Sequence, residues 1–124
     1  MSSNSLNTVL SYYQAGTGHQ FKEMAKYLHP NVQFISPAGQ LDGKPAFLEA
    51  AVGFFKMVES LDIRASFGNG NQVMLAYTAH FPSPVGPFPA AALITLEEGL
   101  IRRMEFFYDP RPILSDREKI FAES

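Results

Sequence analysis

The chain has 124 residues and a formal net charge of −2, with 46% hydrophobic and 18% charged residues. This length fits one domain with a substantial core, and the weak negative charge gives no basic surface for nucleic acid or a membrane. The sequence contains no cysteine, which excludes disulfides, thiolate nucleophiles and cysteine-ligated metals.

The first half of the chain predicts three helices and one strand. Apolar residues recur at helical spacing over 6–16 and 21–28, which predicts two short amphipathic helices. Alternating apolar residues then predict a strand over 32–36, and a proline-glycine turn follows at 37–39. A third helix is predicted over 45–58, because a proline suits its first turn and a broad apolar face follows.

The second half predicts a sheet. The expected strands are 62–67, 72–81, 90–96 and 100–109. A glycine-asparagine turn at 68–71 predicts a hairpin, and four prolines within 82–89 predict a stiff loop at an edge or rim. Because helices cluster before strands, the order favours an α+β fold over a doubly wound one.

The sequence has no internal repeat, low-complexity tract or linker, so we expect a single domain over 1–124. Its core would span about 6–110, and a tail over 111–124 would carry a short helix, which the capping-box spacing from Ser115 predicts. The start of the chain, 1–7, is polar, and no apolar run reaches about eighteen residues, so we expect a cytoplasmic protein without a membrane span.

Three segments carry a family resemblance. They are the helical pair ending His-Pro-Asn-Val at 29–32, the sequence Leu-Asp-Gly-Lys-Pro-Ala-Phe-Leu at 41–48, and the strand end Glu-Phe-Phe-Tyr-Asp-Pro at 105–110. In this order and spacing they resemble the SnoaL-like branch of the nuclear transport factor two superfamily, over about 6–110.

The resemblance implies a cone-shaped α+β fold, the cystatin-like α+β roll. A strongly curved, mixed or antiparallel sheet would wrap around the N-terminal helices and leave a pocket at its open end. The resemblance also implies a homodimer formed through the sheet. Its members include polyketide cyclases, ketosteroid isomerases, hydrolases and non-catalytic binding modules, so the fold alone does not decide the function.

The last strand ends in a carboxylate that follows three aromatic residues. Alternation places on one face of this strand the side chains of Arg103, Glu105, Phe107 and Asp109. If this face lines the pocket, Asp109 is a candidate general acid or base, the role that the resemblance implies for a strand carboxylate. Alternatively, Asp109 is a turn residue that is solvated or bonded to Arg111. One β-bulge would reverse which face points inward.

Other polar residues have supporting roles in this hypothesis. His80 ends a predicted strand, where it would assist Asp109 if the strand ends converge, or would simply be a rim histidine. Arg103, or a hydroxyl of Ser36 or Tyr13, would stabilise developing oxyanion charge. Ser36 stands where the resemblance to ketosteroid isomerases places an aspartate base, which argues against steroid isomerisation.

Eleven phenylalanines predict an apolar cavity rather than a solid centre. The predicted ligand-binding residues are Tyr13, Phe34, Ser36, Phe54, Phe55, Phe88, Arg103, Glu105 and Phe107. We expect no cofactor and no metal, since the three histidines are scattered and have no helical pairing. Two functions stay open: cofactor-free proton transfer on a small hydrophobic molecule, of isomerase, cyclase or hydrolase type, and a non-catalytic ligand-binding or dimerisation module.

Overall fold

The structure is a computed structural model that describes the backbone over 2–111 and the side chains over 4–111. In chain order the elements are α1 (Ser2–Thr17), α2 (Phe21–Ala25), β1 (Leu28–Ser36), β2 (Gly39–Asp42), α3 (Lys44–Met57), β3 (Ser60–Asn69), β4 (Gln72–His80), β5 (Pro87–Glu97) and β6 (Leu100–Phe107). The expected α+β class is confirmed. The tail helix predicted from Ser115 lies outside the described residues.

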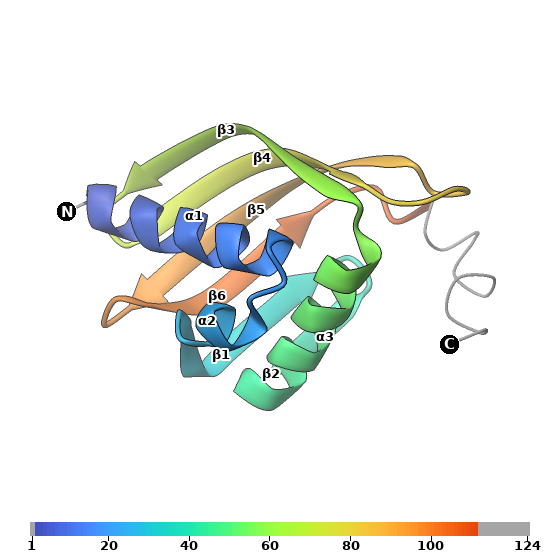
Figure 1. The fold of residues 1–124 in the computed structure, drawn as a ribbon. Helices are drawn as coiled ribbons and strands as arrows, with labels where there is room; N and C mark the ends of the chain where they lie inside the picture. Colours follow the sequence, from blue (N-terminus) through green and yellow to red (C-terminus); the bar gives the residue numbers. More distant parts are fainter. Residues whose placement is uncertain (1, 112–124) are drawn as a thin grey trace.

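The six strands form one sheet in the order β2-β1-β6-β5-β4-β3. Neighbours pair antiparallel except β1 and β6, which run parallel, so the sheet is mixed. Figure 1 shows the sheet bending around α1 and α3, which lie on its concave side. The register shifts between Ile63 and Ala65 in β3 and between Thr95 and Leu96 in β5. Irregularities of this kind generally increase the twist of a strand.

The core lies between the two long helices and the concave face. Along β4, side chains alternate between buried and more exposed, and Val73, Leu75 and Tyr77 are buried. This is the pattern of a sheet with one face on the core. Gly16 of α1 lies against the ring of Phe55 in α3, since a Cβ at this position would come within 2.5 Å of that ring.

Two predicted boundaries near the start of the sheet were wrong. The second helix ends at Ala25 rather than Leu28, because Leu28 already pairs with Ile101 in the parallel β1–β6 ladder. The chain after Ser36 was predicted as a turn that leads directly to a helix. It instead forms β2, which pairs with β1 through four residues as the edge of the sheet.

The proline-rich segment is partly a strand, although it was predicted as a loop up to residue 89. Pro87 and Pro89 belong to β5 and pair with His80 and Thr78 of β4. The β5–β6 ladder begins at Ala91, so this end of β5 has a neighbour on one side only. Proline lacks an amide donor, and an open edge is where this loss is tolerated in a sheet.

Candidate functional site

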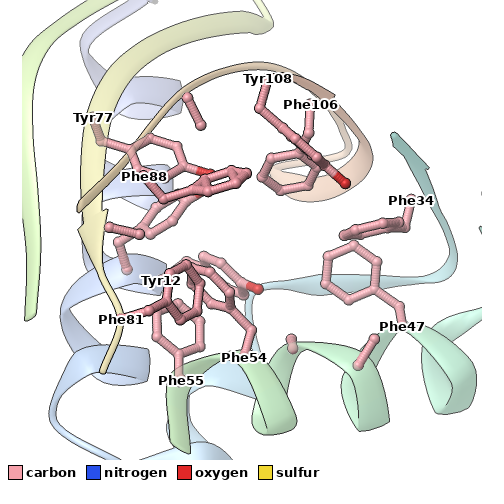
Figure 2. A pocket seen from close by; sticks show the side chains of 15 residues that line it. Tyr12, Phe34, Phe47, Phe54, Phe55, Tyr77, Phe81, Phe88, Phe106 and Tyr108 are labelled. Carbon is pink, nitrogen blue, oxygen red and sulfur yellow. The ribbon is translucent and has the colours of Figure 1, made fainter. Parts of the chain in front are cut away.

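A cavity of about 170 Å³ lies between α1, α3 and the concave face of the sheet. Figure 2 shows aromatic side chains from the sheet facing aromatic side chains from the helices across it. The lining residues are Tyr12, Tyr13, Phe34, Phe47, Ala50, Ala51, Phe54, Phe55, Tyr77, Ala79, Phe81, Phe88, Ala90, Phe106 and Tyr108. Every one of them is phenylalanine, tyrosine or alanine, so the wall is aromatic with small gaps.

The local sequence explains how these side chains reach the cavity. In α3 the lining positions recur three and four residues apart, so they share one face of the helix: Phe47, Ala50, Ala51, Phe54 and Phe55. In β4 and β5 the lining positions are two apart, as on one face of a strand: Tyr77 and Ala79, then Phe88 and Ala90.

Aromatic contacts hold the wall together. The ring of Phe81 packs edge to face against Phe54 at 5.8 Å and against Phe88 at 5.9 Å between centroids. Phe88 in turn contacts Tyr108 at 5.1 Å. Such edge-to-face pairs stabilise by about 0.5–1.5 kcal/mol beyond the area they bury. The residues of the wall are therefore positioned by one another.

A second set of aromatic contacts involves β1. Phe34 lies 5.0 Å from Phe106 of β6 and 5.8 Å from Phe47 of α3 between ring centroids. These contacts connect the parallel strand pair to the helix across the cavity. The arrangement is visible in Figure 2, where Phe34 and Phe47 lie together at one end.

The polar groups on the wall are tyrosine hydroxyls. Burial raises the pKa of Tyr12, Tyr13 and Tyr77 above the ordinary value of 10.0, and repulsion from a neighbouring phenolate adds to each shift, while the contact with Tyr13 offsets part of the rise for Tyr77. These phenols are therefore neutral at physiological pH and can donate hydrogen bonds. The Tyr13 hydroxyl is buried and no partner meets both the distance and the angle of a hydrogen bond. The Tyr77 hydroxyl is near enough for a weak contact, which raises the pKa of Tyr13 and lowers that of Tyr77.

Five of the predicted ligand-binding residues lie on the wall: Tyr13, Phe34, Phe54, Phe55 and Phe88. They come from both long helices and from two strands that are far apart in the sequence. Their contact with a ligand stays a prediction.

The predicted inward face of the last strand was wrong. Arg103, Glu105 and Phe107 lie on the outer, convex face, where Arg103 and Glu105 form an ion pair at 3.5 Å and Phe107 is 44% exposed. The wall instead receives Phe106 and Tyr108. The inward set is apolar and the outward set carries the charges, which is the arrangement that hydrophobic burial favours.

Asp109 follows the end of β6 and lies outside the cavity. Its carboxylate is about half exposed and accepts hydrogen bonds from the guanidinium of Arg111, with Nη2 at 2.7 Å from Oδ2. Hydrogen bonds from the side chain and backbone of Arg111 lower the pKa of Asp109 from 3.8 to about 2. A carboxylate held in this ionised state matches the alternative of a turn residue, and this position does not suit the predicted catalytic role.

His80 and Ser36 also lie off the cavity wall. His80 is the last residue of β4, one position after Ala79, so its side chain lies on the opposite face of the strand and is half-buried. The Ser36 hydroxyl accepts a hydrogen bond from the amide of Ala38 at 3.2 Å and donates one to the carbonyl of Gly39 at 3.3 Å. Ser36 thus stabilises the β1–β2 turn and lies outside the cavity wall.

The sequence analysis missed most of the wall outside the phenylalanines already named. The lining residues that were not among the predicted ligand-binding residues are Tyr12, Phe47, Ala50, Ala51, Tyr77, Ala79, Phe81, Ala90, Phe106 and Tyr108. A usable signal existed in the last strand, since Met104, Phe106 and Tyr108 alternate as an apolar set. Of the four residues that alternate with them, beginning at position 103, three are charged. The alanines carry no such signal, because a small residue on an apolar face is equally common in a filled core.

One group of the described residues has the spacing of a metal site. Ligand atoms of His29, Glu97 and Glu98 lie within 4.8 Å of one another, and none of the three lines the cavity. His29 Nδ1 accepts a hydrogen bond from the amide of Asn31, and Arg102 Nε lies 3.7 Å from Glu97. Ion pairing and hydrogen bonding account for this cluster. None of the helices described over 2–111 is long and apolar enough to span a bilayer.

Comparison with known proteins identifies the family to which this fold is related. The model of the SnoaL-like domain matches residues 9–104. A protein from Kribbella flavida DSM 17836 is 27% identical with a TM-score of 0.84, and the match covers 96% of this chain and 97% of that one. An NTF2-like protein of unknown function from Cytophaga hutchinsonii ATCC 33406 is 26% identical with a TM-score of 0.79, over 89% and 94% of the two chains.

A candidate polyketide cyclase from Sinorhizobium meliloti is 18% identical with a TM-score of 0.75, over 86% of this chain and 99% of that one, and this likeness concerns the fold. No curated protein matches the chain significantly. The family match covers most of the chain and includes the second half of α1, all of α3 and most of the sheet. The chain therefore belongs to the SnoaL-like family of the nuclear transport factor two superfamily.

Proposed function

We propose that the protein binds a small hydrophobic molecule in the aromatic cavity and acts as a ligand-binding module. The observation that carries this proposal is the composition of the wall, which consists of phenylalanine, tyrosine and alanine. Ligand sites are concave and mainly apolar, with a few polar groups that orient the ligand. The tyrosine hydroxyls would supply those polar groups.

The wall gives less support to proton-transfer catalysis. Among the described residues that line it, none is a histidine or a carboxylate, and a buried phenol with a raised pKa is a poor general base at neutral pH. A tyrosine hydroxyl could stabilise an oxyanion, but the proton would need an acceptor from elsewhere. The likeness to a candidate polyketide cyclase concerns the fold, so it does not outweigh this chemistry.

The binding test uses toluene as the probe and two matched variants of β5. Ala90→Leu places a larger side chain in the cavity, whereas Ala91→Leu makes the same change on the opposite face. In a calorimetric or NMR titration we expect toluene to bind the wild type and Ala91→Leu similarly, and Ala90→Leu at least tenfold more weakly. Wild-type protein that does not bind toluene, or equal binding by all three, would contradict the proposal.

A second measurement separates binding from catalysis. Acetophenone exchanges its methyl protons slowly in D₂O, and an enzyme that moves protons next to a carbonyl would accelerate this exchange. We expect acetophenone to bind without faster exchange at substoichiometric protein. Accelerated exchange that Ala90→Leu abolishes would instead establish proton transfer in the cavity.

We also propose that two copies associate through the convex face of the sheet. Phe67 is 69% exposed, Phe107 is 44% exposed and Met74 is 38% exposed on this face. Phe67 pairs with Met74 across β3 and β4, and Ala91 pairs with Phe107 across β5 and β6, so the patch extends over four strands. Exposed apolar patches of this kind mark interaction surfaces.

Sedimentation velocity tests this association. Phe67→Glu puts a charge into the patch and is expected to shift a dimer to a monomer. Gln14→Glu adds the same charge on the exposed side of α1 and should leave the dimer intact. A monomeric wild type at micromolar concentration would refute the proposed association. The cytoplasmic location expected from the sequence remains a prediction.

A further inference from the structure

The volume of the cavity limits the size of its ligand. An apolar cavity of about 150 Å³ in another protein is large enough to bind benzene. The cavity between α1, α3 and the sheet has a volume of about 170 Å³. One six-membered ring with a short substituent fills this space, whereas a second fused ring would have to protrude.

The wall also restricts the charge of the ligand. None of the described lining residues carries a formal charge at neutral pH, since the wall holds phenylalanine, tyrosine and alanine. Burying an ion without a partner is strongly unfavourable, because the ion loses its hydration and gains no counter-charge. A neutral ligand is therefore favoured over a carboxylate or an ammonium of the same size.

One polar group on the wall lacks a partner. The Tyr13 hydroxyl is the buried side-chain polar atom that has no hydrogen-bond partner among the described residues. The ring of Tyr77 lies 6.0 Å away between centroids, and both rings line the cavity. A buried donor without an acceptor is destabilising, so a ligand that brings an acceptor oxygen to this pair of phenols is favoured.

From these three limits we infer that the cavity selects a neutral, single-ring molecule with one hydrogen-bond-accepting oxygen, as in an aryl ketone, held by Tyr13 and Tyr77. This inference rests on the proposed function and names the ligand class of the same cavity. The ring would lie among the phenylalanines, and the oxygen would accept from the phenol pair. Tyr13 and Tyr77 would thus determine specificity, while the apolar wall provides most of the affinity.

The test compares two ligands of the same shape. In α-methylstyrene a methylene group replaces the carbonyl oxygen of acetophenone. Dissociation constants of both are measured by NMR titration for the wild type, Tyr13→Phe, Tyr77→Phe and the control Tyr27→Phe, whose ring is outside the cavity. Comparing the ratio of the two constants between proteins cancels the difference in hydration of the two ligands.

We expect the preference for acetophenone to fall about tenfold in Tyr13→Phe or Tyr77→Phe and to stay unchanged in Tyr27→Phe. Benzoate should bind at least tenfold more weakly than acetophenone. 2-Acetonaphthone should bind no more tightly than acetophenone. If the preference for acetophenone is unchanged in both phenol variants, the inference is overturned while the proposed function stays intact. The same holds if the affinity for benzoate equals the affinity for acetophenone. If neither acetophenone nor α-methylstyrene binds the wild type, both fail.

Discussion

The contact between Gly16 of α1 and Phe55 of α3 makes a quantitative prediction about packing. A Cβ added at Gly16 would lie 2.5 Å from Cε2 and Cζ of the Phe55 ring, whereas ordinary contact begins at 3.4 Å. The ring would have to move by about 0.9 Å, yet Phe55 is 2% exposed and packs edge to face against Tyr12, Tyr13 and Phe54. Overpacking of this kind costs about 1–3 kcal/mol.

Gly53 provides the matched control. It lies at an exposed position in the middle part of α3, and a Cβ added there would meet nothing within 4 Å. In both glycines a change to alanine favours the helix by up to about 1 kcal/mol, less near the end of α1. The difference between Gly16→Ala and Gly53→Ala therefore isolates the contact with Phe55.

Urea unfolding followed by circular dichroism, at one fixed protein concentration, measures this difference. We expect Gly53→Ala to be more stable than the wild type, and Gly16→Ala to be about 1–3 kcal/mol less stable than Gly53→Ala. In thermal unfolding, each kcal/mol corresponds to about 3–6 °C for a chain of this size. If Gly16→Ala gains as much stability as Gly53→Ala, the reasoning about this helix contact is refuted.

The remaining predictions concern titration. Arg111 lowers the pKa of Asp109 to about 2, so we expect an NMR titration midpoint near that value, and Arg111→Gln should move the midpoint towards 3.8. A midpoint above 5 for the wild type would restore Asp109 as a candidate base. Asp109→Asn should leave the affinity for toluene unchanged at pH 7. The raised pKa values of Tyr12, Tyr13 and Tyr77 mean that the fold favours the neutral phenols. Stability should therefore hold below pH 10 and fall as pH rises above it, while ultraviolet titration shows these phenols ionising only on unfolding.

Periodicity was a good guide wherever one face of an element is buried. The helices over 2–17 and 44–57 and the strands over 60–69 and 72–80 agree closely with the patterns in the sequence. The pattern failed where pairing, rather than burial, decides the structure. At 39–42 all but one residue are exposed, and the strand exists because it pairs with β1.

The cavity was predictable in kind but not in detail. The excess of phenylalanine indicated an apolar pocket, and five predicted residues line it. The outward face of β6 was mistaken for the inward one because a carboxylate after three aromatic residues suggested a reactive group. Burial favours the opposite choice, since turning Arg103, Glu105 and Asp109 inward would place three charges in an aromatic cavity.

The alanines of the wall argue that the hollow is maintained rather than incidental. At roughly 24 cal/mol per Å³, the value for a closed cavity, a hollow of about 170 Å³ sets an upper limit of about 4 kcal/mol on the packing energy given up. Larger side chains at Ala50, Ala51, Ala79 or Ala90 would fill it. Ala90→Leu should therefore raise the free energy of unfolding by about 1–2 kcal/mol while it weakens toluene binding, which is the trade-off expected when stability is given up for a site.

A pure dimerisation module has no such need for an empty interior, since its contacts lie on the convex face. The comparison of Ala90→Leu with the wild type in urea unfolding, at one fixed protein concentration, distinguishes these cases, because this change enters the cavity and leaves the convex patch unaltered. If Ala90→Leu is instead destabilised by more than about 1 kcal/mol, as an overpacked core would be, the space near Ala90 is already filled. The argument for a ligand-sized hollow would then fail, although the curved sheet and its aromatic face would stand.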